Sequence, residues 1–274
     1  MTKRSIRRCD RFEIALAMPA IYRVDGNSVL TSPEAAGPWD RRMQHGSAPS
    51  ALVTWAAERI PAPAPMDVAR VTIDLMRPVP VAPLTIESEV LREGRKIQLC
   101  EIKLLAEGVQ VVGATVLKIR RQTQALPDEV KDLPVTLPSP EDSLVEDGHG
   151  ATSPFAGMVS MRAALGRFGK AGPGAIWFRL DHPLVEGEAV SQAMRAVVAA
   201  DFSNGTASTL DFRAWTYINA DLTVSLSRQP VGEWILLDGE SWIGPDGAGL
   251  AMSRLADRQG YFGRAMQSLV IEKR

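Results

Sequence analysis

HGSAPSALVTWAAERI, at residues 45–60, carries apolar residues near helical spacing and is followed directly by Pro61. This pattern predicts a helix over 45–60 that ends before the proline. Ser47 and Ser50 are possible caps at its start. Four strand-like runs follow it: VARVTIDLM (68–76), LTIESEV (84–90), RKIQLCEIKLL (95–105) and VQVVGATVLKI (109–119).

The links between these runs are short. Gly94 and Gly108 precede the third and fourth runs, at positions that suit hairpin turns. Short links favour antiparallel pairing, because parallel strands need crossovers of about a dozen residues or more. We therefore predict one helix followed by four antiparallel strands, an α+β arrangement with the helix on one face of the sheet.

The second half of the chain repeats this order. A strand-like AIWFRLD (175–181) precedes a helical run at 188–201, where apolar residues again fall on one side. Four more strand-like runs follow: INADLTVSLSR (218–228), EWILLDGESW (233–242), GLAMSRLAD (249–257) and YFGRAMQSLVIEK (261–273).

The two halves also align in register. Arg77 matches Arg228, and each of these arginines has a proline within two residues. Gly108 matches Gly260, the turn glycine before the last run. The near-constant spacing of these pairs predicts an internal duplication.

The length and a break in composition support two lobes. The chain has 274 residues, and a single core usually stops growing at about 250. Residues 122–154 are rich in Pro, Asp, Glu, Ser and Gly and have no apolar period, which is typical of an extended linker. We therefore divide the chain into a first lobe (1–121), a linker (122–154) and a second lobe (155–274).

Bulk composition excludes several classes of function. The formal net charge of −1 offers no overall attraction for nucleic acid. No stretch approaches the roughly 18 uncharged apolar residues of a membrane span, and the basic N-terminus has too short an apolar run for a signal peptide. Cys9 and Cys100 are too few for a disulfide framework and indicate free thiols in a reducing compartment. We therefore expect a soluble, cytoplasmic protein.

Metal and cofactor motifs are missing from the sequence. The three histidines are scattered without metal-ligand spacing, so no metal is predicted. GAGL at 247–250 lacks the third glycine of a dinucleotide fingerprint, and no GxSxG occurs. No cofactor is expected. His45 could cap the first helix or contact a ligand, and a structural role is the preferred interpretation.

An ordered set of local segments carries a family resemblance. In the first half it comprises WDRRMQHGSAPSALVTWAAE (39–58), RPVP (77–80) and EVLREGR (89–95). In the second half it comprises AADFSNG (199–205), NADLTVSLSRQPVGEWILL (219–237) and GLAMSRLADRQGYFGRAMQSLVI (249–271). The chain resembles the acyl-CoA thioesterase II type of the thioesterase-like superfamily. The resemblance implies a tandem double-hotdog fold, in which an antiparallel β-sheet wraps the central helix of each lobe.

The resemblance also implies an activity and a site. In that family an Asp on the second central helix, a hydroxyl or amide on the next strand and a Gln on the last strand orient and activate a water. The matching residues are Asp201, Asn219 and Gln267. Better-known members have Thr where this chain has Asn219, and Asp221 and Thr223 lie close enough in sequence to compete for the role. The implied reaction is hydrolysis of an acyl-CoA to a free acid and CoA, as in fatty acid metabolism, by a homodimer or larger homo-oligomer.

Residue chemistry agrees with this assignment. Asp201 lies near the end of its predicted helix, where a negative charge opposes the helix dipole at a cost of roughly 0.3–1 kcal/mol. A residue kept at a cost is a hint of function. Gln267 corresponds to Thr115 in the duplicated frame. The first helix carries no Asp or Asn, so we expect one site, in the second lobe, and a first lobe that is degenerate and mainly structural.

Arg228 and Arg264 could meet the phosphates of CoA, although solvated arginines are the more usual outcome. Two other functions remain open. One is a non-catalytic hotdog protein that binds acyl-CoA or lipid. The other is a hydratase or dehydratase, which would want a His paired with an Asp or Glu beside a helix. The second helix carries no His, which argues against that chemistry.

Overall fold

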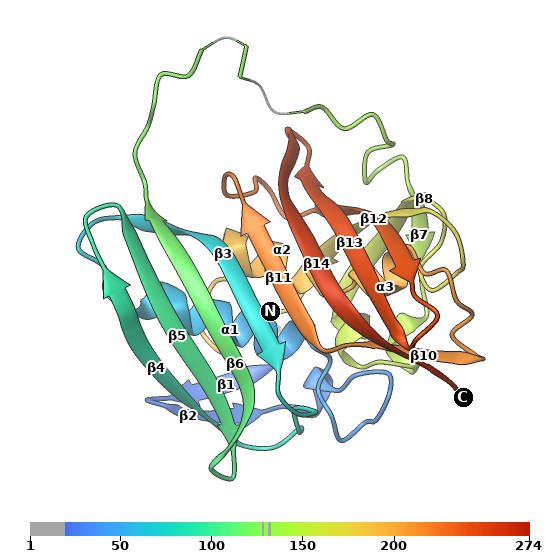
Figure 1. Ribbon diagram of the computed structural model, residues 1–274, viewed down its shortest axis with the longest axis horizontal. Coiled ribbons are helices and arrows are strands. Elements are labelled where there is room, and N and C mark those ends of the chain that lie inside the picture. Colours follow the sequence, from blue (N-terminus) through green and yellow to red (C-terminus); the bar gives the residue numbers. More distant parts are fainter. Residues whose placement is uncertain (1–19, 128, 131–132) are drawn as a thin grey trace, which may run out of the picture.

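A computed structural model describes residues 20–127, 129–130 and 133–274. In this part of the chain fourteen strands form one sheet, and every strand pair is antiparallel (Figure 1). Thirteen of them follow the order β1-β2-β4-β5-β6-β3-β11-β14-β13-β12-β9-β8-β7, and β10 pairs with β14 beside this path. Sequence patterning thus predicted the antiparallel pairing correctly.

The first half supplies one long helix and six strands. Its elements are β1 (Tyr22–Asp25), β2 (Ser28–Thr31), a 3-10 turn η1 (Pro33–Ala35), α1 (Ser47–Arg59), β3 (Met66–Leu75), β4 (Leu84–Glu93), β5 (Ile97–Ala106) and β6 (Val109–Arg120).

The second half supplies two helices and eight strands. Its elements are β7 (Leu144–Glu146), η2 (His149–Ala151), η3 (Phe155–Met158), β8 (Val159–Leu165), β9 (Gly174–Leu180), α2 (Gln192–Ala200), α3 (Ser203–Thr206), β10 (Trp215–Asn219), β11 (Asp221–Leu226), β12 (Ile235–Ile243), β13 (Ala248–Asp257) and β14 (Gly260–Lys273).

The two halves of the sheet meet where β3 pairs with β11. Thr72 stands opposite Thr223, and Val71 stands opposite Val224. β3 is the first strand after α1, and β11 is the second strand after α2 and α3, following the short β10. On either side of this seam come β6 and β14, then β5 and β13, then β4 and β12. Equivalent strands therefore lie at equivalent distances from the centre of the sheet.

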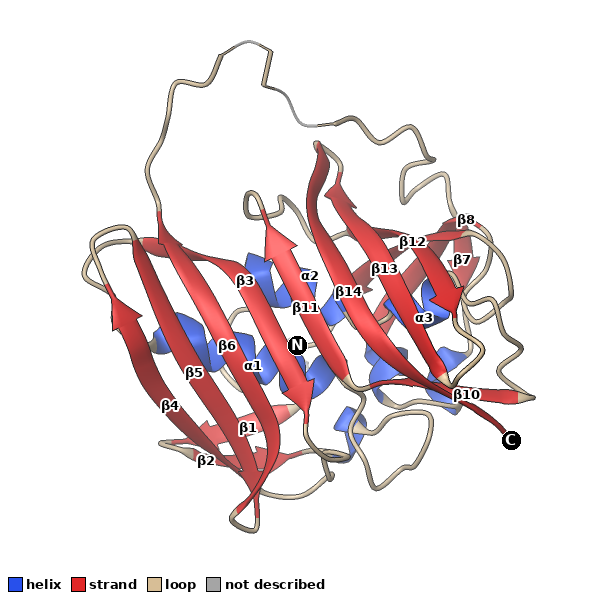
Figure 2. Ribbon diagram, in the orientation of Figure 1, coloured by secondary structure: helices blue, strands red, loops and turns tan. Residues whose placement is uncertain are grey.

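Helices α1 and α2 lie side by side on one face of the sheet (Figure 2). Ten of the thirteen residues of α1 are buried, which is typical of a helix surrounded by protein on all sides. Both helices bury several alanines, whose small side chains permit close packing. They are Ala48, Ala51, Ala56 and Ala57 in α1 and Ala193, Ala196, Ala199 and Ala200 in α2.

The structure adds four strands that the sequence analysis did not predict, β1, β2, β7 and β8, and three predicted features differ locally. Gly46, not Ser47 or Ser50, is the N-cap of α1, and the ring of His45 accepts a hydrogen bond at Nδ1 from the backbone N–H of Ser47, 3.2 Å away, as expected for a capping side chain. The predicted strand 218–228 breaks at Ala220 into β10 and β11. The end of the predicted linker 122–154 is structured, because β7 pairs with β8.

No helix in the described ranges has the length and apolar character needed to cross a bilayer. Cys100 is a buried free thiol. Cys9 lies outside the described residues.

Candidate active site

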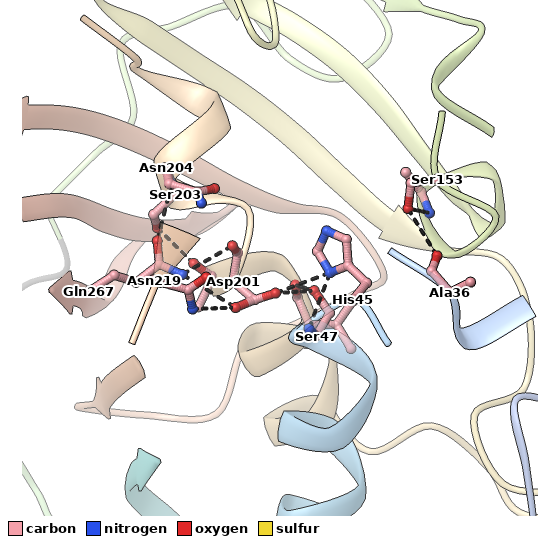
Figure 3. A network of polar contacts seen from close by, with 12 residues as sticks. Ala36, His45, Ser47, Ser153, Asp201, Ser203, Asn204, Asn219 and Gln267 are labelled. Atoms are coloured by element: carbon pink, nitrogen blue, oxygen red, sulfur yellow. Dashed lines mark hydrogen bonds and ion pairs between the residues drawn. The ribbon is translucent and has the colours of Figure 1, made fainter. Parts of the chain in front are cut away.

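Asp201 stands at the centre of a buried polar cluster at the end of α2 (Figure 3). Only 3% of the residue is exposed. Its Oδ1 accepts hydrogen bonds from Asn219 Nδ2 at 3.0 Å and from Gln267 Nε2 at 3.3 Å. The structure therefore brings together the three residues that the family resemblance selected, from three different elements.

Gln267 lies behind Asp201 and away from solvent. It occupies an inward position on β14, where its neighbours on the same face are apolar, and its exposed fraction is zero. Its Nε2 also donates to the backbone oxygen of Asp201 at 3.1 Å, and its Oε1 accepts from the backbone N–H of Asn204, also at 3.1 Å. With these contacts Gln267 holds the carboxylate in place.

Asn219 is the last residue of β10, just before the break at Ala220. Its Nδ2 also donates to the backbone oxygen of Asp221 at 3.2 Å. The Asp221 carboxylate instead accepts from Ser268, from the backbone N–H at 2.5 Å and from Oγ at 3.3 Å. Thr223 lines a separate hollow. Among the three candidates for this position, Asn219 is the one in contact with Asp201.

The first lobe contributes two residues that sequence reasoning did not place here. His45 Nδ1 lies 3.1 Å from Asp201 Oδ2, and Ser47 Oγ lies 3.1 Å from the same oxygen. The hydroxyl of Ser47 is also 3.0 Å from the backbone oxygen of Val198. The interpretation of the first lobe as mainly structural does not account for these contacts, which make the cluster a joint product of both lobes.

His45 is held in a defined orientation. Its backbone N–H donates to Ala35 O at 2.8 Å. Its ring stacks on Phe155 with centroids 5.1 Å apart and an interplanar angle of 18°, and it lies 4.5 Å from the ring of Phe202. The sequence did contain a signal for it, because His45 and Gly46 directly precede the start of a buried helix.

AADFSNG forms the junction between two helices. Asp201 is the C-cap of α2, and Gly205 lies within the next helix, α3. A Cβ at Gly205 would lie 2.5 Å from the ring of Phe168. The close approach of that ring explains why a glycine is needed there.

A cavity of about 1050 Å³ opens in front of the cluster. His45, Asp201 and Asn219 line it, whereas Gln267 does not. Its apolar wall includes Trp39, Phe212 and Tyr217, which form an aromatic cluster with centroid separations of 4.9–6.2 Å. Burial raises the pKa of Tyr217, which favours the neutral phenol in this wall.

Three exposed cationic residues stand around the cavity: Arg77, Lys170 and Arg213. The arginines singled out from sequence lie elsewhere. Arg228 forms an ion pair with the buried Asp257, with an Nη1–Oδ2 distance of 2.6 Å, and Arg264 lines the separate hollow that also contains Thr223. Neither lines the cavity beside Asp201.

Metal-ligating side chains do not gather in this region. Across residues 20–127, 129–130 and 133–274, no group of three or more His, Cys, Asp or Glu side chains is placed to hold a metal ion.

Two family models match the sequence. The acyl-CoA thioesterase N-terminal domain matches residues 35–119, and the acyl-CoA thioesterase C-terminal domain matches residues 127–271. None of the curated proteins matches the sequence.

Solved structures similar to this chain share its fold. One is a conserved protein of unknown function with hot dog fold from Alicyclobacillus acidocaldarius, with a TM-score of 0.73 and 15% identity over 92% of this chain and 95% of that one. Another is the tesB protein of Mycobacterium avium subs paratuberculosis, with a TM-score of 0.67 and 17% identity over 91% and 95% of the two chains. A third is the acyl-CoA thioesterase II TesB2 of Mycobacterium marinum, with a TM-score of 0.66 and 16% identity over 92% and 95%. These likenesses show a hotdog fold.

Because the C-terminal family model alone spans more than half of the 274 residues, the chain belongs to the acyl-CoA thioesterase family.

Proposed function

We propose that this protein hydrolyses an acyl-CoA thioester to a free acid and CoA, with a water activated at the cluster of Asp201, Asn219 and Gln267. The observation that carries the proposal is the buried Asp201 carboxylate, which borders a large cavity and is held by both amides. Membership of the acyl-CoA thioesterase family supports the same chemistry.

The reaction needs a nucleophilic water and a means of removing its proton. General-base assistance is worth typically about 10²–10⁴-fold in rate. The negative charge of Asp201 provides the driving force for proton removal. Asn219 borders the cavity and is placed to hold the water, while Gln267 fixes Asp201 from behind.

Charge and polarity around the cavity fit the two ends of an acyl-CoA. Arg77, Lys170 and Arg213 are exposed cations that would attract the phosphates of CoA. The aromatic wall of Trp39, Phe212 and Tyr217 would remove an acyl chain from water. The acyl chain would then lie on the apolar wall with CoA toward the cations.

The finer architecture belongs to the same proposal. We infer two tandem hotdog units, with α1 and α2 as their central helices, because equivalent strands are arranged symmetrically about the β3–β11 seam. A free thiol at Cys100 agrees with a cytoplasmic location. Pairing with a second copy would cover the outer edge of β4, of which β2 covers only Leu84 and Thr85. A monomeric mass in light scattering would contradict that pairing.

A thiol-release assay tests the activity. Purified protein is given acyl-CoAs of several chain lengths with a thiol-reactive dye, and we expect steady release of CoA. Asp201→Asn should lower kcat by about 10²-fold or more, because the amide carries no negative charge. Asp246→Asn, at an exposed turn residue, is the matched control and should keep wild-type rates. Acyl-CoA binding without thiol release at any chain length would instead support the non-catalytic alternative.

One contact favours a second candidate, hydration of an enoyl-CoA. That chemistry was set aside because the second helix carries no His, but the first lobe places His45 against Asp201. A His beside a carboxylate could add water across a conjugated double bond. Loss of the enoyl-thioester absorbance without thiol release would favour the hydratase. Loss matched mole for mole by thiol release would exclude it, because hydrolysis of the thioester removes the same absorbance.

A further inference from the structure

Thioester hydrolysis needs a group that stabilises the carbonyl oxygen when that oxygen becomes negatively charged. Hydrogen-bond donors that are already in position supply this stabilisation without reorganisation during the reaction. Beside Asp201, the side-chain amides of Asn219 and Gln267 donate to the carboxylate and hold it in place. A further donor therefore has to face the cavity.

The backbone at the start of α1 offers few free donors. The N–H of Ala48 donates to His45 O at 3.0 Å. The N–H of Ser50 donates to Gly46 O at 3.1 Å, and the residue before Ser50 is a proline without an N–H. The N–H of Ser47 donates to the ring of His45 at Nδ1, 3.2 Å away. A side chain is therefore the better candidate for the donor.

The contact at Nδ1 decides where the imidazole of His45 carries its proton. Nδ1 accepts the N–H of Ser47, so in the neutral ring the proton is on Nε2. In a protonated ring both nitrogens carry a proton, and Nδ1 would then pair with Asp201 Oδ2, 3.1 Å away. Nε2 is an N–H donor in both of these states.

Nε2 of His45 is presented to the cavity in a fixed direction. It points away from the carboxylate of Asp201 (Figure 3). The side chain lines the cavity and is 12% exposed. The polar contacts of the ring with Ser47 and Asp201 use Nδ1, which leaves the N–H of Nε2 for a ligand. The rings of Phe155 and Phe202 fix the plane of the imidazole, so the donor is preorganised.

We propose that the N–H of His45 Nε2 is the catalytic donor that binds the thioester carbonyl oxygen and stabilises its negative charge. The inference deepens the proposed function and rests on it, and Asp201 keeps its role as the base. Water adds its oxygen to the carbonyl carbon while one of its protons passes to Asp201, and the carbonyl electron pair moves onto the oxygen bound at Nε2. When the C=O bond re-forms, the C–S bond breaks and the departing sulfur takes the proton from Asp201. The products are the free acid and CoA thiol.

The base and the donor lie close enough to act on one carbonyl group. Asp201 Oδ2 lies 3.1 Å from Nδ1 of His45, and Nε2 stands on the far side of the same ring. Asp201, Asn219 and His45 all line the cavity. A thioester with its oxygen at Nε2 thus has its carbonyl carbon beside the water that Asp201 and Asn219 would hold. The first lobe then supplies the donor and the second lobe supplies the base.

¹⁵N NMR measures the position of the proton without any activity assay. In the full-length protein the imidazole nitrogens of His45, assigned by comparison with His45→Asn, should show a proton on Nε2. A neutral ring with its proton on Nδ1 would overturn the proposal, because Nε2 would then be an acceptor.

Two amide variants separate the donor from the helix cap. His45→Asn keeps an oxygen that can accept the N–H of Ser47 but has no atom at the place of Nε2, whereas the longer side chain in His45→Gln brings an N–H there. We expect His45→Asn to lower kcat by about 10²–10³-fold, the usual loss for one such donor, and His45→Gln to recover about tenfold of that loss. KM should change little, because the interaction strengthens only in the transition state. His182→Gln, at a histidine outside the cavity lining, should keep wild-type kcat.

Infrared spectroscopy detects the hydrogen bond in the bound state. The probe is a ketone analogue of acyl-CoA, in which a methylene group separates a ¹³C-labelled carbonyl from the sulfur, so that no thiol can be released. Its carbonyl stretch should lie at a lower frequency when bound to the wild type than when bound to His45→Asn, because a donor polarises the C=O bond. The same frequency in both complexes would overturn the proposal.

The outcomes separate the two proposals. A wild-type protein that binds the ketone analogue but releases no thiol from any acyl-CoA contradicts the proposed function. An active wild type with unchanged kcat in His45→Asn overturns the role of His45 alone, and so do equal losses of kcat in both amide variants with an unchanged infrared frequency. If His45→Asn does not fold, the wild type decides: on binding, the carbonyl stretch should fall below its value in water, and a rise would overturn the role.

Discussion

Gly46 is the residue that allows the two lobes to share one carboxylate. Its φ of −57° and ψ of −28° lie in the ordinary helical region, so an alanine would suffer no backbone strain there. The difficulty is space, because the added methyl group would lie 2.7 Å and 2.8 Å from the oxygens of Asp201. Real Cβ atoms do not approach so closely, and either α1 or the carboxylate must shift.

We therefore predict that Gly46→Ala lowers kcat by about 10²-fold, the loss that a displacement of roughly 1 Å can cause. Steady-state thiol release measures it. Gly94→Ala is the control, because the nearest atom to its added methyl group is 3.6 Å away, an ordinary contact. Wild-type kcat in Gly46→Ala would mean that the site tolerates a shifted Asp201.

Single residues also show how far sequence reasoning reached into the site. Asp201, Asn219 and Gln267 could be selected because each stands at a family-like position in a recognisable element. His45 could not be assigned with them, because nothing in the sequence states that the start of α1 meets the end of α2. Ser47 resembled a helix cap, a role that needs only local sequence, but its hydroxyl instead lies near Val198 O and Asp201 in the other lobe.

A buried lysine on the sheet donates hydrogen bonds to the C-terminal end of helix α1. Lys118 on β6 is 3% exposed, and its Nζ donates to the backbone oxygens of Ala57 at 3.0 Å and Ile60 at 2.8 Å. These carbonyls at the end of the helix would otherwise be left without a donor. Burial lowers the pKa of Lys118. This cation thus tethers the end of the helix to the strand that crosses it.

Lys118→Met keeps the apolar stem and removes the donor. We expect the free energy of unfolding to fall by roughly 1–3 kcal/mol at neutral pH, the usual cost of unsatisfied buried groups. In the wild type, between the lowered pKa of folded Lys118 and the ordinary lysine value of about 10.4, the unfolded chain binds more protons, so this residue's contribution to stability rises with pH. The variant should lack that alkaline increase.

Urea titrations of both proteins at neutral and alkaline pH measure this difference. Lys96→Met, at an exposed lysine, controls for the loss of a charge. An equal difference between Lys118→Met and wild type at every pH would show that the pKa of Lys118 is the same in the folded and the unfolded protein.

Elements with strong periodicity were predicted well, and those set by tertiary contacts were not. The helix expected over 45–60 forms over Ser47–Arg59, because its apolar spacing and Pro61 are local signals. The strand expected over 218–228 divides at Ala220, which donates its N–H to Ser268 O and accepts from Leu75 N. That break turns Asn219 toward Asp201, and it depends on partners from β14 and the end of β3 that local sequence does not contain.

In the part of the chain that the structure describes, the two lobes form one continuous sheet. β3 and β11 pair directly, α1 packs on α2, and the polar cluster takes side chains from both halves. Residues 122–126 between the lobes are exposed. Association of the halves should therefore depend on the sheet and the helices and not on the connecting chain.

This predicts the behaviour of a cut chain. A protease recognition sequence inserted between Thr123 and Gln124 should allow cleavage into two fragments that still elute together in native size-exclusion chromatography and keep the thiol-release activity of the uncut insertion protein. Either half expressed alone should be inactive, since His45 and Asp201 lie on different fragments, and mixing the separately refolded halves should restore activity.

Separation of the cut fragments under native conditions would show that the β3–β11 seam and the α1–α2 contact do not hold the lobes together. Activity in the second half alone would show that Asp201 works without the first lobe, and the joint construction of the site would then have no catalytic consequence.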